Sequence, residues 1–196
     1  MSRWLLALPL AIFGVGGIGL YILFIGQAGG AAVHENLLPE LIGFCLEGFF
    51  LVGLLTFVQQ LREMDRRREL WLSLRGALRD FLSHLDLAYL DADAEPATTR
   101  DLETQPKVVL RLMDSMQKMD LDTDTLVELK RAAISTLPMA QDLIDIAAQL
   151  STGHMRWWIA IVESIKHLSE ADTREEAERP IYAMLQHLSE FDALKT

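Results

Sequence analysis

Two acidic residues lie within an apolar stretch of the 196-residue chain. Glu47 falls near the middle of the run from about residue 37 to residue 58, and Glu40 precedes it by seven positions, which places both on nearly the same helix face. Gly43 lies between them on that face and permits close approach of another helix. An acidic side chain at membrane depth costs roughly 2.5–3.5 kcal/mol and normally faces protein or water. These carboxylates are therefore the first functional candidates.

Two interpretations of Glu47 remain open. The apolar runs contain no Lys, Arg or His, so no basic side chain of the same subunit neutralises the carboxylate there. In the first interpretation, Glu47 belongs to a carboxylate ring along a cation path, or to a gate that responds to protonation. In the second, a neutral Glu47 holds helices together by a hydrogen bond. Because two spans cannot enclose a pore, the first interpretation requires several subunits.

Two predicted membrane spans must position these carboxylates. Residues 4–25 carry no charge, and each run reaches the length of about 20 residues that crosses a hydrocarbon core as a helix. The first run exceeds the roughly 7–15 apolar residues of a signal peptide, which favours an uncleaved span. Arg3 precedes the first span and an arginine cluster follows the second, so both termini are expected on the cytoplasmic side of a bacterial inner membrane. This cluster, expected to contact lipid headgroups, consists of Arg62, Arg66, Arg67 and Arg68.

Glycines in the first span predict close helix packing. Residues 14–19 formally contain GxGxxG, but the dinucleotide motif needs a preceding strand and a following amphipathic helix. Within a span, glycines instead let helix backbones approach each other. The predicted packing positions are Gly14 and Gly17, together with Gly43 of the second span. Combined with Glu47, they predict a homo-oligomer.

The rest of the chain predicts an all-α cytosolic bundle of four to five helices. Apolar residues recur at three- and four-residue steps from residue 59 to residue 90, and no segment alternates like a strand. Residues 91–104 are expected to form a loop. Thr125 and Thr173 each begin a capping-box pattern that predicts the start of a helix, and Pro138 is expected to kink the first of these.

Charge is unevenly distributed along the chain, whose formal net charge is −10. Residues 62–79 carry six Arg against three acids, whereas residues 80–196 carry 11 basic and 22 acidic residues. Anionic lipid attracts the basic segment at about 1 kcal/mol per charge. The acidic part is a poor general binder of nucleic acid, because that affinity comes from Lys and Arg. We expect the lipid bilayer and a cytosolic protein or small ligand as partners. The predicted organisation is a transmembrane hairpin (1–61), a basic juxtamembrane helix (62–90) and an acidic bundle (91–196).

Catalytic and metal-binding patterns are sparse. Arg79 and His84 form an R-x(4)-H pattern that resembles the R-x(4–6)-H signature of HEPN ribonucleases, helical domains whose Arg and His act on the RNA backbone. The alternative is two polar residues on the exposed side of an amphipathic helix. The histidines lack the paired spacing of zinc ligands, and a single cysteine excludes an internal disulfide. We predict no enzymatic activity, no cofactor and no metal.

The string from Asn36 to Gly43, which reads Asn-Leu-Leu-Pro-Glu-Leu-Ile-Gly, leads through an apolar span into a charged helix. It resembles the second span of a set of uncharacterised bacterial two-span inner-membrane proteins. The layout is also similar to that of membrane effectors of prokaryotic antiviral systems, in which a soluble domain senses a signal and the spans perturb the membrane. The likeness implies an oligomeric effector or pore-type subunit. The alternatives are a non-conducting anchor that recruits a cytosolic partner and a membrane-tethered HEPN-like ribonuclease.

Overall fold

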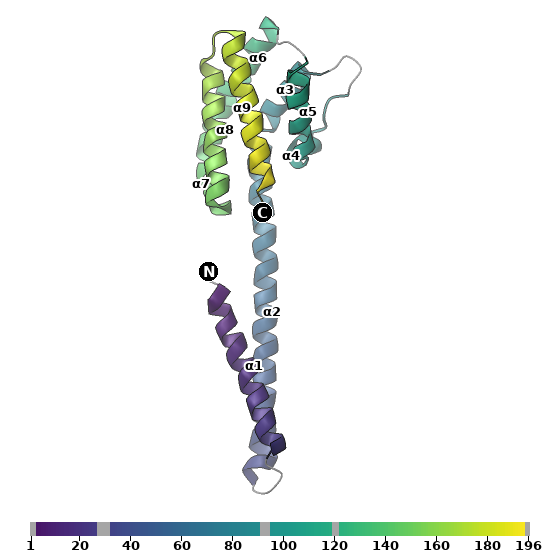
Figure 1. Cartoon of the computed structure of the whole chain (residues 1–196), viewed down its shortest axis with the longest axis vertical. Coiled ribbons are helices and arrows are strands. Elements are labelled where there is room, and N and C mark those ends of the chain that lie inside the picture. The colour runs from purple at the N-terminus through teal and green to yellow at the C-terminus, as the bar shows by residue number, and fades with distance from the viewer. Residues whose placement is uncertain (1–2, 27–31, 91–94, 119–121, 195–196) are drawn as a thin grey trace. The chain divides into compact units, whose positions relative to one another are not determined.

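The computed structural model describes residues 3–26, 32–90, 95–118 and 122–194, with side chains at 11–22 and, within the remaining ranges, from residue 40 onward. All regular secondary structure in these ranges is α-helical, as predicted. The chain divides into two compact units, residues 1–65 and 66–196. The helices, shown in Figure 1, are α1 (Arg3–Gly26), α2 (Ala32–Ala77), α3 (Arg79–Ala88), α4 (Thr99–Thr104), α5 (Pro106–Met116), α6 (Thr123–Asp142), α7 (Ile144–Leu150), α8 (Thr152–Glu170) and α9 (Arg174–Ala193).

The first unit contains α1 and the greater part of α2. Among the described residues, one segment, Glu40–Ala77, is long and apolar enough by length and composition to cross a membrane. Its most apolar window is almost entirely exposed, unlike the core helix of a soluble protein. The apolar segment described within α1, Ala11–Ile22, is shorter. The first predicted span therefore stays a prediction, since the side chains at both ends of residues 4–25 lie outside the described residues.

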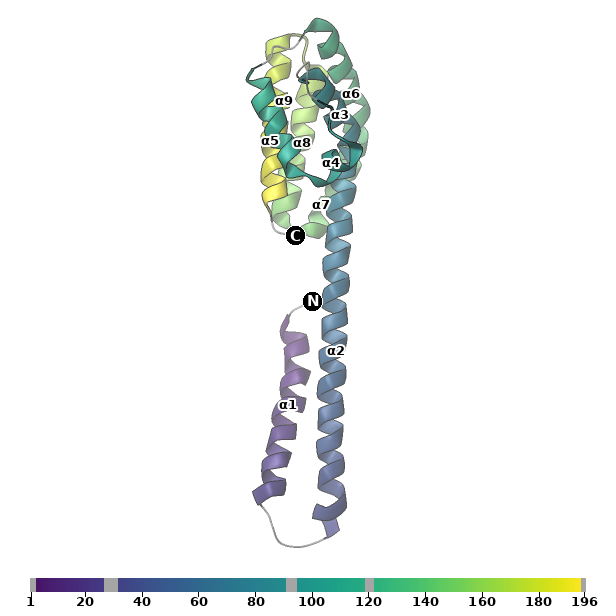
Figure 2. The same ribbon diagram turned by 90° about the vertical axis from the view of Figure 1, so that its right-hand side faces the viewer.

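The second unit is a helical bundle, as the sequence predicts. Helices α8 and α9 lie side by side, α6 and α7 pack on α8, and α5 packs on α9 (Figure 2). The C-terminal part of α2 contributes Leu74 to the same core. Large side chains that are almost fully buried fill the centre of the bundle: Phe81, Leu85, Leu129, Trp158, Ile161, Ile165, Ile181, Leu188 and Phe191.

Two predicted helices are each divided in the structure. The expected helix over residues 59–90 breaks at Leu78, between α2 and α3. The helix expected to run to Leu150 breaks at Leu143, after α6 has continued through Pro138 to Asp142. The buried indole N–H of Trp158 donates to the carbonyl of Ala140 over 2.8 Å. Because the last carbonyls of a helix lack helical partners, this bond stabilises the end of α6.

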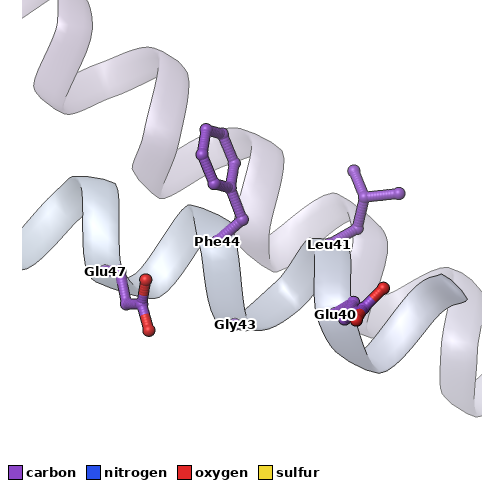
Figure 3. A pocket seen from close by; sticks show the side chains of 5 residues that line it. All are labelled: Glu40, Leu41, Gly43, Phe44 and Glu47. Carbon is purple, nitrogen blue, oxygen red and sulfur yellow. The ribbon is translucent and has the colours of Figure 1, made fainter. Parts of the chain in front are cut away.

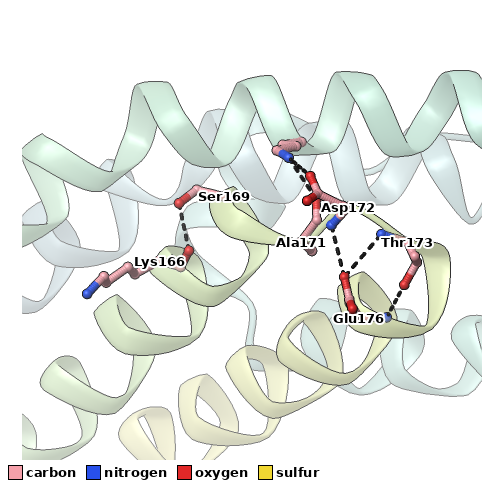
Figure 4. Close-up of polar contacts among 7 residues, drawn as sticks. Lys166, Ser169, Ala171, Asp172, Thr173 and Glu176 are labelled. Carbon is pink, nitrogen blue, oxygen red and sulfur yellow. Dashed lines mark hydrogen bonds and ion pairs between the residues drawn. The ribbon is translucent and has the colours of Figure 1, made fainter.

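The capping predictions have different outcomes. The capping box at Thr173 is confirmed: its hydroxyl accepts from the N–H of Glu176, whose carboxylate accepts in return from the N–H of Thr173 (Figure 4). Lys130 of α6 donates to the carbonyl of Ala171 over 2.8 Å and so ties α6 to the turn between α8 and α9. The box predicted at Thr125 is wrong, because the N-cap of α6 is Asp122, whose carboxylate accepts from the N–H of Thr125.

The predicted loop over residues 91–104 is wrong in its second half. Residues 99–104 form α4, and the hydroxyl of its N-cap, Thr98, accepts from the N–H of Asp101 over 3.2 Å. A helix of this length is too short to show the repeating apolar pattern from which longer helices are predicted. Residues 91–94 lie outside the described part of the chain.

Candidate functional site on the apolar part of α2

Helix α1 packs against one side of α2, and glycines set the distance of approach. At Gly48, an added Cβ would lie only 2.5 Å from the ring of Phe13. At Gly17, it would lie 3.3 Å from the Cβ of Cys45. Gly14 is placed similarly, with the ring of Phe49 at 3.5 Å. The side of α2 covered by α1 is therefore the side that carries residues 45, 48 and 49, and Phe44 lies at its edge, with its ring centroid 6.0 Å from that of Phe13.

Glu40, Gly43 and Glu47 lie together on another side of α2 (Figure 3). They line an open hollow of about 510 Å³, together with Leu41 and Phe44. Both glutamates are exposed, and a Cβ added at Gly43 would meet none of the described atoms within 4 Å. The structure thus groups three of the residues singled out by the sequence and places them where α1 does not cover them.

The chemistry open to this face follows from the spacing of its carboxylates. Residues seven positions apart lie about 10 Å apart along a helix axis, so Glu40 and Glu47 do not share a proton within one chain. Each carboxylate is instead free to accept hydrogen bonds or to contribute oxygen ligands to a cation together with other chains. Their neighbours on the exposed surface are large and apolar: Leu41, Phe44, Leu46, Phe50 and Leu51. This face of α2 therefore carries two carboxylates surrounded by apolar side chains.

The four arginines that follow the apolar part of α2 are not equivalent. Arg62 and Arg68 are exposed, whereas Arg67 is half-buried. Arg66 donates from Nη2 to the side-chain oxygen of Gln149 in α7 over 2.9 Å. Burial lowers the pKa of His154, and the positive charge of Arg67 lowers it further. Two of the four arginines thus act on the bundle, and two present their charge to solvent.

Arg79 and His84 have different surroundings on α3. The Arg79 guanidinium forms ion pairs with Asp80 at 3.0 Å and with Glu103 of α4 at 3.2 Å. His84 lines a small hollow of about 100 Å³ against Glu128 and its neighbours on α6, and its Nδ1 lies 2.7 Å from the carbonyl oxygen of Asp80. Two carboxylates already neutralise the cation that a ribonuclease would direct at a phosphate.

Other candidate ligands do not converge within the described residues, which contain no group of three His, Cys, Asp or Glu side chains able to hold a metal ion. His154 is buried, and its Nδ1 lies 2.8 Å from the hydroxyl of Ser151. His187 packs against Trp157, with ring centroids 5.6 Å apart. Cys45 is a free, half-buried thiol.

Sequence reasoning missed three residues with defined roles. At Gly48 the two helices of the hairpin come closest together. The sequence feature that could have identified this glycine is its position one helical turn after Cys45, on the same helix face. Arg75 and Asp192 form an ion pair in the bundle, where their side chains are 0% and 2% exposed. Nothing in the local pattern separates them from exposed charges, because Arg and Asp are rarely buried unless paired and their partners are distant in sequence.

Comparison of the chain with protein-family models, with curated proteins and with solved structures finds no match. The likenesses to two-span membrane proteins, antiviral effectors and HEPN ribonucleases therefore stay predictions.

Proposed function

We propose that this chain is one subunit of a homo-oligomeric, two-pass effector in a bacterial inner membrane, of the kind used in antiviral defence. In this proposal α1 and the apolar part of α2 both span the bilayer, and both termini are cytoplasmic. The face of α2 that bears Glu40 and Glu47 meets other subunits and lines a cation path. The bundle regulates this path by binding a cytosolic protein or small ligand.

The observation that carries the proposal is the uncovered position of Glu47. Helix α1 packs on another side of α2, so the hairpin alone leaves this carboxylate facing outward among apolar side chains. In a bilayer that arrangement costs roughly 2.5–3.5 kcal/mol unless protein or water covers the carboxylate. A neighbouring subunit supplies both, because assembled copies exclude lipid and enclose water. The open space at Gly43 permits a second helix to come close.

The distribution of charge supports the orientation. Arg62 and Arg68 are exposed just after the apolar part of α2, where cytoplasmic arginines follow a span. The part of the chain beyond residue 79 is strongly acidic, which favours a basic or cationic partner in the cytosol over a nucleic-acid backbone. The same charges keep the bundle away from anionic lipid.

The test combines subunit counting with conductance. The full chain is placed in lipid nanodiscs for native mass spectrometry and in planar bilayers for current measurements. We expect an assembly of several subunits and a cation-selective current. Glu47→Gln removes the charge with little change in shape and is expected to reduce the current at least about tenfold, since rings of carboxylates attract cations. Glu69→Gln is the matched control, because it removes an exposed carboxylate from the same helix outside the apolar part.

A monomer in nanodiscs, or the same current in the Glu47→Gln variant, would contradict the cation path. An assembly of several subunits that carries no current supports instead the non-conducting anchor. The ribonuclease alternative has less support, since Arg79 is engaged by two carboxylates. Its test is RNA cleavage by the full chain and by His84→Ala, where retained cleavage rules out that site.

A further inference from the structure

One ion pair lies inside the bundle, apart from the face of α2 described above. The guanidinium of Arg75, near the end of α2, is fully buried, and its Nη1 lies 3.3 Å from Oδ2 of Asp192 in the last turn of α9. Arg75 also donates from Nη2 to the carbonyl of Gln105 over 3.4 Å. Its guanidinium carbon lies 5.9 Å from the ring centroid of Trp71. The pair therefore joins α2, α9 and the junction of α4 with α5.

The pairing of these two buried charges is incomplete. Within the described part of the chain, Nε of Arg75 and both carboxylate oxygens of Asp192 have no hydrogen-bond partner, and the ion pair itself lacks hydrogen-bond geometry. Burying a charge is unfavourable unless hydrogen bonds and a close counter-charge offset the loss of hydration. Apolar residues of similar volume would often stabilise such a position more. The pair is a poor arrangement for stability alone.

The neighbours of Asp192 show what the pair holds in place. Phe191 packs against Trp158 and His154, with ring centroids 5.7 Å and 5.0 Å apart. Leu194 lies beside Gly153, where an added Cβ would be 3.2 Å from its side chain. Residues 191–194 thus fasten the end of α9 to α8 by apolar contacts and to α2 by an ion pair. Undocking this segment would return both charges to water. Their hydration would offset part of the free energy lost with the apolar contacts.

We propose that residues 191–194 form a releasable clasp on α2, in which the Arg75–Asp192 pair is the contact that opens. This inference rests on the proposed function, because it names the step by which the bundle restrains the membrane helix. Helix α2 is a single element from Ala32 to Ala77, so Arg75 and the Glu47 face belong to the same helix. Docking of the clasp restrains α2 and limits the current, and a cytosolic ligand that stabilises the undocked segment increases the current.

The test is hydrogen–deuterium exchange of the full chain in nanodiscs at pH 7.5. Arg75→Met leaves the carboxylate buried without a cation, and amides of residues 188–193 are expected to exchange at least about tenfold faster, because local opening sets their rate. Amides in the centre of α8 are expected to keep their rates. The double variant Arg75→Met/Asp192→Leu replaces the pair with apolar side chains and is expected to slow exchange in the same segment. Glu190→Gln is the matched control, since Glu190 is exposed on the same turn.

Faster exchange throughout the bundle in Arg75→Met, or no local change, would overturn the clasp and identify the pair as an ordinary packing element. So would a double variant that opens as readily as the native chain. Hydrogen exchange tests the clasp, whereas subunit number and current test the proposed function. Each proposal can therefore be contradicted without the other. If Arg75→Met opens locally but the native chain is monomeric and carries no current, the proposed function alone is contradicted. If the native chain is a conducting assembly but Arg75→Met shows no local opening, the clasp alone is contradicted.

Discussion

Raising the pH is expected to weaken the bundle through a single carboxylate. Burial raises the pKa of Asp192 to about 6 from an ordinary value of 3.8, although the charge of Arg75 acts in the opposite direction. A group whose pKa is higher in the folded state binds its proton more tightly there than in the unfolded chain. Its contribution to stability is therefore complete below pH 3.8 and is lost as the pH rises through 6.

The magnitude follows from the difference between the two pKa values. Each unit corresponds to 1.36 kcal/mol, so the whole contribution is about 3 kcal/mol. Between pH 5 and pH 7.5 the folded state alone loses its proton at this site, and the expected loss is about 1.4 kcal/mol. Asp122 does not change this difference, because a backbone hydrogen bond from Thr125 lowers its pKa below the ordinary value of 3.8, so its carboxylate is charged in the folded and the unfolded chain throughout this range.

The assay isolates Asp192 by difference. Urea unfolding of the full chain in detergent micelles, followed by tryptophan fluorescence, is measured for the native chain and for Asp192→Asn at several pH values. The variant, whose side chain is neutral at every pH, is expected to gain about 1.4 kcal/mol on the native chain between pH 5 and pH 7.5. A constant difference would show that the carboxylate does not titrate in this range. A difference of the opposite sign would show that attraction to Arg75 exceeds the effect of burial.

Three further variants test the packing. Gly48→Ala is expected to push α1 away from α2 and to speed maleimide labelling of the single cysteine about tenfold, because overpacking costs about 1–3 kcal/mol, whereas Gly19→Ala meets open space and is expected to leave labelling unchanged. Trp158→Phe leaves the carbonyl of Ala140 buried without its indole donor and is expected to lower the free energy of unfolding by about 2–3 kcal/mol, measured by urea titration; an unchanged midpoint would refute the role of that bond. Thr173→Ala removes the N-cap of α9 and is expected to cost about 1 kcal/mol in the same titration, while Thr173→Ser is expected to retain it.

The sequence predicts the helices better than the positions at which they break. The capping box at Thr173 is local information, complete within four residues, and the structure confirms it. The break at Leu143 is not local, since an indole from α8 accompanies it and reaches the last turn of α6. Pro138 predicts a kink in this helix, and α6 continues through Pro138 to Asp142. Where tertiary contacts decide a boundary, periodicity indicates only the neighbourhood of the break.

The candidate site shows the same division between local and distant information. Helical spacing predicts that Glu40 and Glu47 share a face, because a seven-residue interval is nearly two turns. It does not predict which face α1 covers, and that choice leaves Glu47 exposed. Arg75 was missed for a related reason: its partner Asp192 is 117 positions later, and no local pattern links the two.

The glycines of the hairpin have a consequence for sequence variation. Gly48 has a constraint internal to the chain, because the ring of Phe13 occupies the space that a side chain would need. Gly43 has no such constraint among the described residues, so a single folded copy would accept alanine, serine or larger residues there. Selection therefore acts for different reasons at the two positions. If substitutions at Gly48 are not tolerated, the packing within one chain explains it, whereas if substitutions at Gly43 are not tolerated, a molecule outside the chain must contact it.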